Sequence, residues 1–249
     1  MINIKTDHEI EIMLMAGRIT KKALAKTLEA VKPGVSTLEL DQIALDVILS
    51  ENAVPAFLNY NGFPKSICAS VNDEIVHGIP SLERILVEGD IVSIDVGAIF
   101  NGYVGDCADT IGVGSIGKEA QRLIDVTRQS FYEGFAYCKP GCRLQDISAA
   151  IQAHVEANGF SIVRDYVGHG IGSKMHEDPS VPNFGKAGRG VRLEKGMTLA
   201  IEPMVNQGTH KTKLMADGWT AKTADESLSA HYENTIAITS GTPVILTEL

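Results

Sequence analysis

The spacing of apolar and polar residues predicts two helices at the start of the chain. Apolar side chains recur every three or four positions between residues 10 and 28, which is the period of an amphipathic helix. Thr6 and Glu9 have the spacing of a capping box, so the first helix is expected to begin near Asp7. A second capping-box spacing opens residues 36–51, and a Pro-Gly pair between the two segments ends the first helix.

A β-hairpin is predicted further along, because two apolar, β-branched segments flank a two-residue turn. The segments are residues 91–99 and 103–113, and Asn101-Gly102 between them favours a type I′ turn. A loop of this length also fixes the register of the two strands, and therefore which side chains share a face of the sheet.

The second half of the chain repeats the pattern of the first. Lys-Pro-Gly at residues 32–34 recurs at 139–141, an offset of 139 − 32 = 107, and the same offset aligns Asp95 with Glu202. Two related halves packed face to face would bring their matched acids into one cleft. The elements expected in the second half are helices over 117–138 and 144–157 and strands near 161–167, 197–206 and 231–238.

The composition is that of an ordinary globular protein, and it fits a reducing compartment. Hydrophobic residues make up 44% of the chain, enough for a sizeable core, and the net charge of 22 − 31 = −9 argues against DNA or an anionic membrane as partners. The four cysteines form no Cys-x-x-Cys motif and are expected to be reduced thiols. No secretory signal or membrane-spanning segment is present, so a cytoplasmic location is expected. We predict one catalytic domain over residues 1–249, with pseudo-symmetric halves at roughly 7–113 and 114–249.

Four acids in apolar strand segments are the candidate metal-binding residues. Asp95 and Asp106 lie on opposite arms of the hairpin, where the register makes them diagonal neighbours on one face. Such a pair can bracket two metal ions, whereas burial without a cation would be costly. Glu202 and Glu233 occupy apolar segments of their own, so four inward-facing carboxylates are expected, and that number demands cations.

Three histidines are singled out by their surroundings. His169 lies in Gly-His-Gly-Ile-Gly, whose glycines let the backbone approach another group closely and expose the imidazole. His77 begins His-Gly-Ile-Pro, and His176 begins His-Glu-Asp-Pro. The remaining histidines are expected to be ordinary core or surface residues: His8, His154, His210 and His231.

Four carboxylates and one imidazole suit Mn, Fe, Co or Zn better than a thiolate-bound structural zinc. Two divalent ions in such a site would lower the pKa of a shared water and polarise a carbonyl, and Glu202 could shuttle the proton. The sequence therefore predicts metal-assisted hydrolysis.

Six segments, in this order and spacing, give the chain an end-to-end resemblance to a known family. They are NYNGFPKSICASV at 59–71, HGIP at 77–80, GDIVSIDVGAIFNGYVGDCAD at 89–109, VGHGIGSKMHE at 167–177, MTLAIEPMV at 197–205 and DGWTAKTADESLSAHYENT at 217–235. On these segments the chain resembles the type I methionine aminopeptidases. The resemblance implies an α+β pita-bread fold, with two pseudo-symmetric halves forming a curved antiparallel sheet covered by helices. An early first helix and a short interval between Glu202 and Glu233 resemble the type I form without an N-terminal extension.

The resemblance also implies roles for the matching residues. Two divalent ions, Co, Mn, Fe or Zn, would be bound by Asp95, Asp106, His169, Glu202 and Glu233, of which Asp106 and Glu233 would bridge them. Glu202 would relay the proton, His77 would contact the scissile amide, and His176 would stabilise the oxyanion.

A methionine pocket beside these groups is implied as well. It would consist of Phe57, Tyr60, Phe63, Cys68, Met175 and Trp219. Bacterial relatives often carry Cys at the position of Phe57 and a larger aromatic at that of Met175, so a different pocket shape is expected. An auxiliary Na or K ion would be held by backbone oxygens of Asn72, Glu74 and Ser229.

The implied function is removal of the initiator methionine from peptides and nascent chains, preferably before a small second residue. A monomer with transient ribosome contact is expected. Three alternatives stay open: a proline-cleaving peptidase with the same ligands, a binding protein that has lost catalysis, and a dinuclear phosphoesterase. The proline-cleaving peptidase would differ in its substrate. The binding protein would have lost some of the metal-binding residues, and the phosphoesterase would require a glycine-rich segment or basic cluster that binds phosphate.

Overall fold

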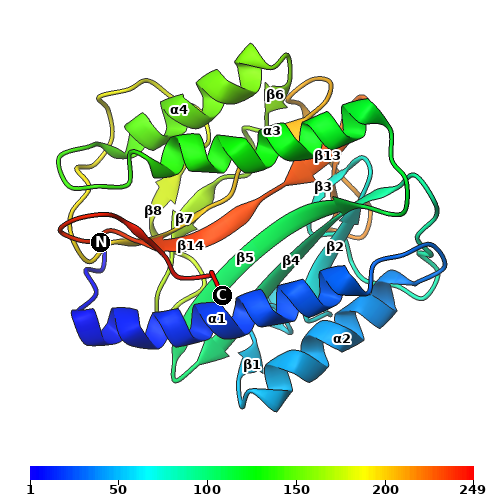
Figure 1. Cartoon of the computed structure of the whole chain (residues 1–249), viewed down its shortest axis with the longest axis horizontal. Coiled ribbons are helices and arrows are strands. Elements are labelled where there is room, and N and C mark those ends of the chain that lie inside the picture. The colour runs from blue at the N-terminus through cyan, green and yellow to red at the C-terminus, as the bar shows by residue number, and fades with distance from the viewer.

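A nine-stranded antiparallel sheet runs through the centre of the molecule, and two pairs of helices pack beside it (Figure 1). The computed structural model describes residues 1–249. The helices are α1 (Asp7–Glu29), α2 (Thr37–Ser50), η1 (Tyr60–Gly62, a 3₁₀ turn), α3 (Lys118–Phe135) and α4 (Leu144–Ala157). The strands are β1 (Val54–Pro55), β2 (Ile67–Val71), β3 (Glu74–Val76), β4 (Ile91–Phe100), β5 (Tyr103–Gly112), β6 (Ser161–Ile162), β7 (Gly168–Gly170), β8 (Glu177–Val181), β9 (Thr198–Ile201), β10 (Met204–Asn206), β11 (Thr212–Leu214), β12 (Ala221–Thr223), β13 (Ser229–His231), β14 (Glu233–Ala237) and β15 (Val244–Ile245).

The main sheet contains strands from both halves of the chain. Its order is β1-β4-β5-β14-β9-β7-β8, with β2 paired to β4 and β15 to β14. Two three-stranded sheets, β13-β10-β6 and β11-β12-β3, stand beside it. Within the main sheet, strands from the first and second halves meet where β5 pairs with β14, and outside it β3 of the first half pairs with β12 of the second.

Both predicted N-terminal helices form with their capping boxes. Thr6 caps α1 and Ser36 caps α2, and in each case the glutamate three residues on completes the box. Glycines let α1 lie directly on the hairpin, because a Cβ on Gly105 of β5 would lie 2.7 Å from Cα of Gly17. A larger residue at Gly105 would force α1 away from the sheet, whereas a Cβ on Gly17 would lie 2.2 Å from the carbonyl oxygen of Leu246 in the C-terminal segment.

The β4–β5 hairpin has the predicted turn and register. Asn101 and Gly102 both have positive φ, 47° and 80°, as a type I′ turn requires. Asp95 pairs with Ala108, so the face on which each hairpin acid lies follows from the turn alone.

Strands form within both predicted segments, 197–206 and 231–238, but neither segment is one continuous strand. The first segment is divided by Glu202-Pro203 into β9 and β10, and Tyr232 separates β13 from β14. In both cases one piece belongs to the main sheet and the other to a three-stranded sheet. Proline has no N–H to donate to a strand ladder, so the chain leaves the main sheet beside one of the candidate acids. The strand predicted near 161–167 is also shorter than expected, since only β6 forms.

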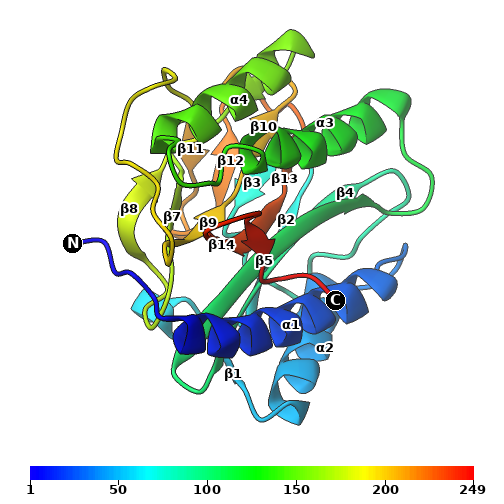
Figure 2. The ribbon, with the colours of Figure 1, turned by 60° about the vertical axis from the view of Figure 1, so that its left-hand side comes forward.

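Two apolar cores support the two ends of the sheet. One lies between α1, α2 and strands β2, β4 and β5, and the other between α3, α4 and the strands of the second half. Figure 2 shows the helix pairs on opposite sides of the strands. The order of a helix pair followed by strands thus occurs twice along the chain, in line with the expected halves, which stay a prediction. No helix of the protein combines the length and apolar character needed to cross a membrane.

Candidate metal centre

Strand register brings the predicted metal-binding acids onto one face of the main sheet. Asp95 on β4 pairs with Ala108 on β5, and Ala108 pairs in turn with Glu233 on β14. The β14–β9 register, continued one residue past the end of β9, puts Glu202 opposite Glu233. Asp106 is two residues from Ala108 and so lies on the same face. Four acids from four strand segments therefore converge across the β5–β14 seam.

These acids are buried in a way that calls for cations. Asp106 and Glu233 are 3% and 2% exposed, and one oxygen of each, together with Oδ1 of Asp95, has no hydrogen-bond partner. Burial raises the pKa of Asp95 to about 7. Burial and then repulsion between the carboxylates raise the pKa of Asp106, Glu202 and Glu233 well above the usual range. A divalent cation would satisfy the unpartnered oxygens and relieve the repulsion, so these residues fit a metal centre.

His169 on β7 supplies an imidazole to the same centre. Its Nδ1 donates a hydrogen bond of 2.9 Å to the carbonyl of Gly170, which leaves the lone pair of Nε2 for a cation. Nε2 lies 3.6 Å from Oε1 of Glu202 and 3.9 Å from Oδ2 of Asp106. Burial lowers the pKa of His169 to about 4, so the ring is neutral near pH 7.

The glycines around His169 serve close packing, as expected, but they do not expose the ring. A Cβ on Gly168 would lie 2.4 Å from the carbonyl oxygen of Ala200, and one on Gly170 would lie 2.1 Å from that of Asp178. His169 is 7% exposed, so the prediction of an exposed imidazole was wrong. Because these glycines have no side chains, β7 can pack between β8 and β9 as a buried strand. This position brings the imidazole of His169 close to the acids.

A cavity of about 220 Å³ opens over the acids and continues into an apolar pocket. Phe63 and Trp219 meet edge to face at 5.2 Å, and Met175 and Phe57 are each 7% exposed. The lining contains every residue predicted to bind metal, act in catalysis or contact the methionine side chain: Phe57, Tyr60, Phe63, Cys68, His77, Asp95, Asp106, His169, Met175, His176, Glu202, Trp219 and Glu233.

The two accessory histidines reach this cavity from irregular backbone. His77 has a left-handed φ of 61°, a strained conformation for a residue with a Cβ. The Nδ1 of His176 is hydrogen-bonded to the hydroxyl of Tyr60 at 2.8 Å, so Tyr60 orients His176 as well as lining the pocket. Burial lowers the pKa of both histidines.

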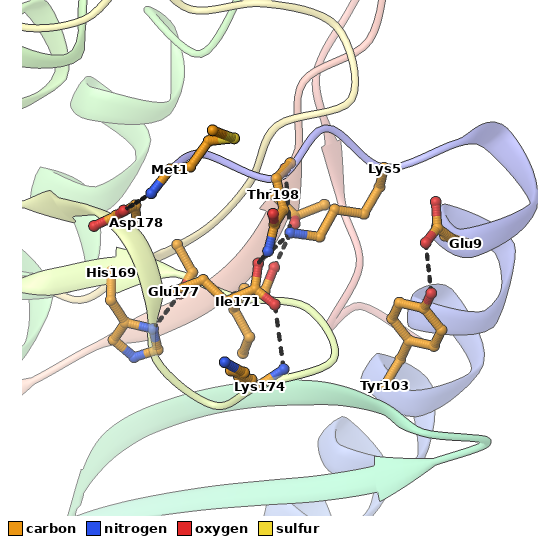
Figure 3. A network of polar contacts seen from close by, with 12 residues as sticks. Met1, Lys5, Glu9, Tyr103, His169, Ile171, Lys174, Glu177, Asp178 and Thr198 are labelled. Carbon is orange, nitrogen blue, oxygen red and sulfur yellow. Dashed lines mark hydrogen bonds and ion pairs between the residues drawn. The ribbon is translucent and has the colours of Figure 1, made fainter.

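The loop that carries His176 is held in place by contacts with residues 1–6, the segment before α1 (Figure 3). Lys5 Nζ lies 2.6 Å from Oε2 of Glu177, and their side chains are 5% and 3% exposed. Asn3 Nδ2 and the backbone N–H of Lys174 also donate to the Glu177 carboxylate, at 3.1 and 3.2 Å. Burial alone would raise the pKa of Glu177, but these donors outweigh it and hold the pKa below its usual value.

Two residues, one lining the cavity and one beside its acids, were not anticipated from the sequence. Asn61 lines it from η1. His231, expected to be an ordinary core or surface histidine, is 2% exposed and has its Nε2 3.9 Å from Glu202 and 3.7 Å from Glu233. The available signal was its position two residues before Glu233, because alternate residues of an extended chain share a face.

The residues of the expected auxiliary cation site lie in neighbouring segments, since β3, which begins at Glu74, contacts β13, which begins at Ser229. The N–H of Ser229 donates a hydrogen bond of 2.9 Å to the carbonyl of Asn72, so those two residues adjoin. The carboxylate of Glu74 accepts from the N–H of Val71 at 2.9 Å. A monovalent cation at this place stays a prediction.

Comparison with known proteins identifies the family. Residues 11–240 match metallopeptidase family M24. The chain belongs to this family. Over 99% of both chains it is 55% identical to the methionine aminopeptidase of Clostridium acetobutylicum. The crystal structure of methionine aminopeptidase from Thermotoga maritima superposes with a TM-score of 0.99 at 46% identity, covering 100% of both chains.

These relatives confirm the resemblance to methionine aminopeptidases and the α+β pita-bread fold. They also confirm that the protein is a metal-dependent hydrolase. A prolidase from Pyrococcus furiosus superposes with a TM-score of 0.75 at 23% identity, which shows the shared fold alone. The chain covers 65% of that prolidase.

Proposed function

We propose that the protein removes the N-terminal methionine from peptides and nascent chains by metal-dependent hydrolysis, preferring a small second residue. The observation that carries the proposal is the position of two buried acids, two half-buried acids and a buried histidine in a cavity of about 220 Å³ that has an apolar end. The sequence identity to methionine aminopeptidases over the whole chain supports the substrate class.

The centre would hold two divalent ions, Co, Mn, Fe or Zn, between Asp95, Asp106, His169, Glu202 and Glu233. Asp106 and Glu233 are suited to bridge them, because both are buried where the two halves of the sheet meet. When bound, the ions supply Lewis-acid activation of water and of the scissile carbonyl.

The side chains around the ions would move the proton and stabilise charge. Glu202 can accept the proton of the attacking water and pass it to the leaving amine. His176, oriented by its hydrogen bond with Tyr60, can stabilise the oxyanion of the tetrahedral intermediate. His77, held by its strained backbone at the cavity wall, can contact the scissile amide.

The apolar end of the cavity would select methionine. Aromatic walls and the polarisable sulfurs of Cys68 and Met175 suit an unbranched thioether side chain. The edge-to-face pair of Phe63 and Trp219 makes a rigid wall at this end. A β-branched or charged first residue would fit this pocket poorly.

We further propose that the protein acts as a single catalytic domain with halves at roughly 7–113 and 114–249, as a cytoplasmic monomer with transient ribosome contact. The repeated order of a helix pair and strands supports the halves. The auxiliary Na or K ion near Asn72, Glu74 and Ser229 belongs to this proposal.

The function is tested by measuring methionine release from Met-Ala-Ser after chelation and stepwise restoration with Mn, Fe, Co and Zn. We expect release only with metal, a much slower reaction with Met-Trp-Ser, and no cleavage of Ala-Pro-Ser. Replacing Glu202 by Ala should abolish release, whereas replacing His154, which lies outside the cavity on α4, should not. Cleavage of the proline peptide, or no methionine release with any metal, would contradict the proposal.

A further inference from the structure

A second histidine lies beside the acids, near the oxygen of Glu202 that His169 does not approach. His231 is 2% exposed, and its Nε2 has no hydrogen-bond partner. A buried ring nitrogen normally has a partner, so this atom requires an explanation. It lies 3.9 Å from Oε2 of Glu202 and 3.7 Å from Oε2 of Glu233.

The fold holds this ring in place through the backbone. His231 ends β13 and pairs with Met204 on β10. Its N–H donates to Oγ1 of Thr110 at 2.9 Å, and its carbonyl accepts a hydrogen bond of 2.7 Å from the same hydroxyl. Thr110 belongs to β5, the strand that also carries Asp106. The backbone of His231 is therefore tied to the strand beneath the metal centre.

His231 stands in nearly the same relation to the acids as His169. His169 Nε2 lies 3.6 Å from one oxygen of Glu202, and His231 Nε2 lies 3.9 Å from the other. Two sets of side chains have ligand atoms close enough to share an ion: Asp106, His169 and Glu233 in one, and Glu202, His231 and Glu233 in the other. Glu233 is common to both.

Lack of a partner does not by itself mark a metal-facing histidine. His154 Nε2 is also buried without a hydrogen bond, yet no carboxylate oxygen lies within 4.0 Å of that ring. Besides His169, only His231 combines an unpartnered Nε2 with two acids of the candidate centre.

We propose that His231 is a further ligand of the metal centre and presents Nε2 to the ion that Glu202 and Glu233 also hold. The inference rests on the proposed dinuclear centre and adds a second imidazole to it. Imidazole suits Zn, Co and Fe better than Mn, which prefers oxygen ligands. The second nitrogen therefore favours the softer of the candidate metals at that position.

Metal titration of the chelated full-length protein tests the assignment. Co²⁺ binding is followed by calorimetry and by visible absorption in the wild type, His231→Ala, His231→Gln and the control His154→Ala. We expect one of two Co²⁺ sites to weaken by at least about tenfold in both His231 variants, with a changed absorption spectrum. The control should retain both sites. Glutamine keeps an N–H donor, so wild-type affinity and spectrum in His231→Gln would show that the imidazole is no ligand.

X-ray absorption of the Zn-loaded wild type gives an answer without any variant. The spectrum gives the average number of imidazole ligands per zinc ion. If His169 and His231 both bind, this number is one, and if His169 alone binds, it is one half. The lower value would overturn the assignment of His231 while leaving the dinuclear centre intact. Failure of the wild type to bind two ions would instead contradict the proposed function.

Discussion

Removing the charge of Lys5 should destabilise the protein strongly, although Lys5 lies outside the cavity. Its ion pair with Glu177 is nearly inaccessible to solvent, with 5% and 3% exposure of the two side chains. Removing one partner of a buried pair leaves an uncompensated charge and costs about 3–5 kcal/mol. At about 2–4 °C per kcal/mol for a chain of this size, K5M should lower the Tm by roughly 6–20 °C.

Guanidinium denaturation of K5M, E177M and the double variant K5M/E177M measures the effect. The double variant should recover most of the lost stability, since two apolar side chains leave no unpaired charge. K195M is the matched control, because the Lys195–Asp7 pair is 51% and 75% exposed and should contribute at most about 1 kcal/mol. A loss below about 1 kcal/mol in K5M, or no recovery in the double variant, would refute the reasoning.

Three further outcomes are expected. Gly17→Ala should cost about 1–3 kcal/mol in denaturation, since its Cβ would lie 2.2 Å from a backbone carbonyl oxygen of the C-terminal segment, whereas Gly241→Ala, with open space around it, should be neutral. Tyr60→Phe should lower kcat/KM for Met-Ala-Ser by about two- to tenfold, through loss of the hydrogen bond to His176, with unchanged stability. The metal-free protein should lose stability as the pH rises from about 4 to about 7, because folded Asp95, with its pKa raised from 3.8 to about 7, keeps a proton that the unfolded chain releases. Saturating metal should abolish this loss, and a metal-free protein that gains stability over the same range would contradict the burial of the acids.

Much of the fold follows from local signals in the sequence. The capping boxes at Thr6 and Ser36 mark the starts of α1 and α2. The Asn101-Gly102 turn fixes the hairpin register that aligns Asp95 with Ala108. In each of these cases the residues of one short segment determine the local backbone conformation. Packing against the rest of the chain therefore does not change the predicted structure.

Features that depend on packing between distant segments could not be predicted in the same way. The break at Tyr232 arises because the chain changes sheets, which no local pattern encodes, whereas Pro203 was a local signal for the break after Glu202. The strand at His169 forms among glycines, residues that disfavour strands unless another backbone approaches closely. His231 lacked any motif of its own.

The central claim is that five side chains from separate segments gather around two divalent ions at the β5–β14 seam. The most direct measurement is an anomalous difference map from crystals of the protein soaked in Mn²⁺ or Zn²⁺. We expect two peaks about 3.5–4 Å apart, enclosed by Asp95, Asp106, His169, Glu202 and Glu233. Peaks confined to other parts of the surface, with no density between these residues at saturating metal, would contradict the account.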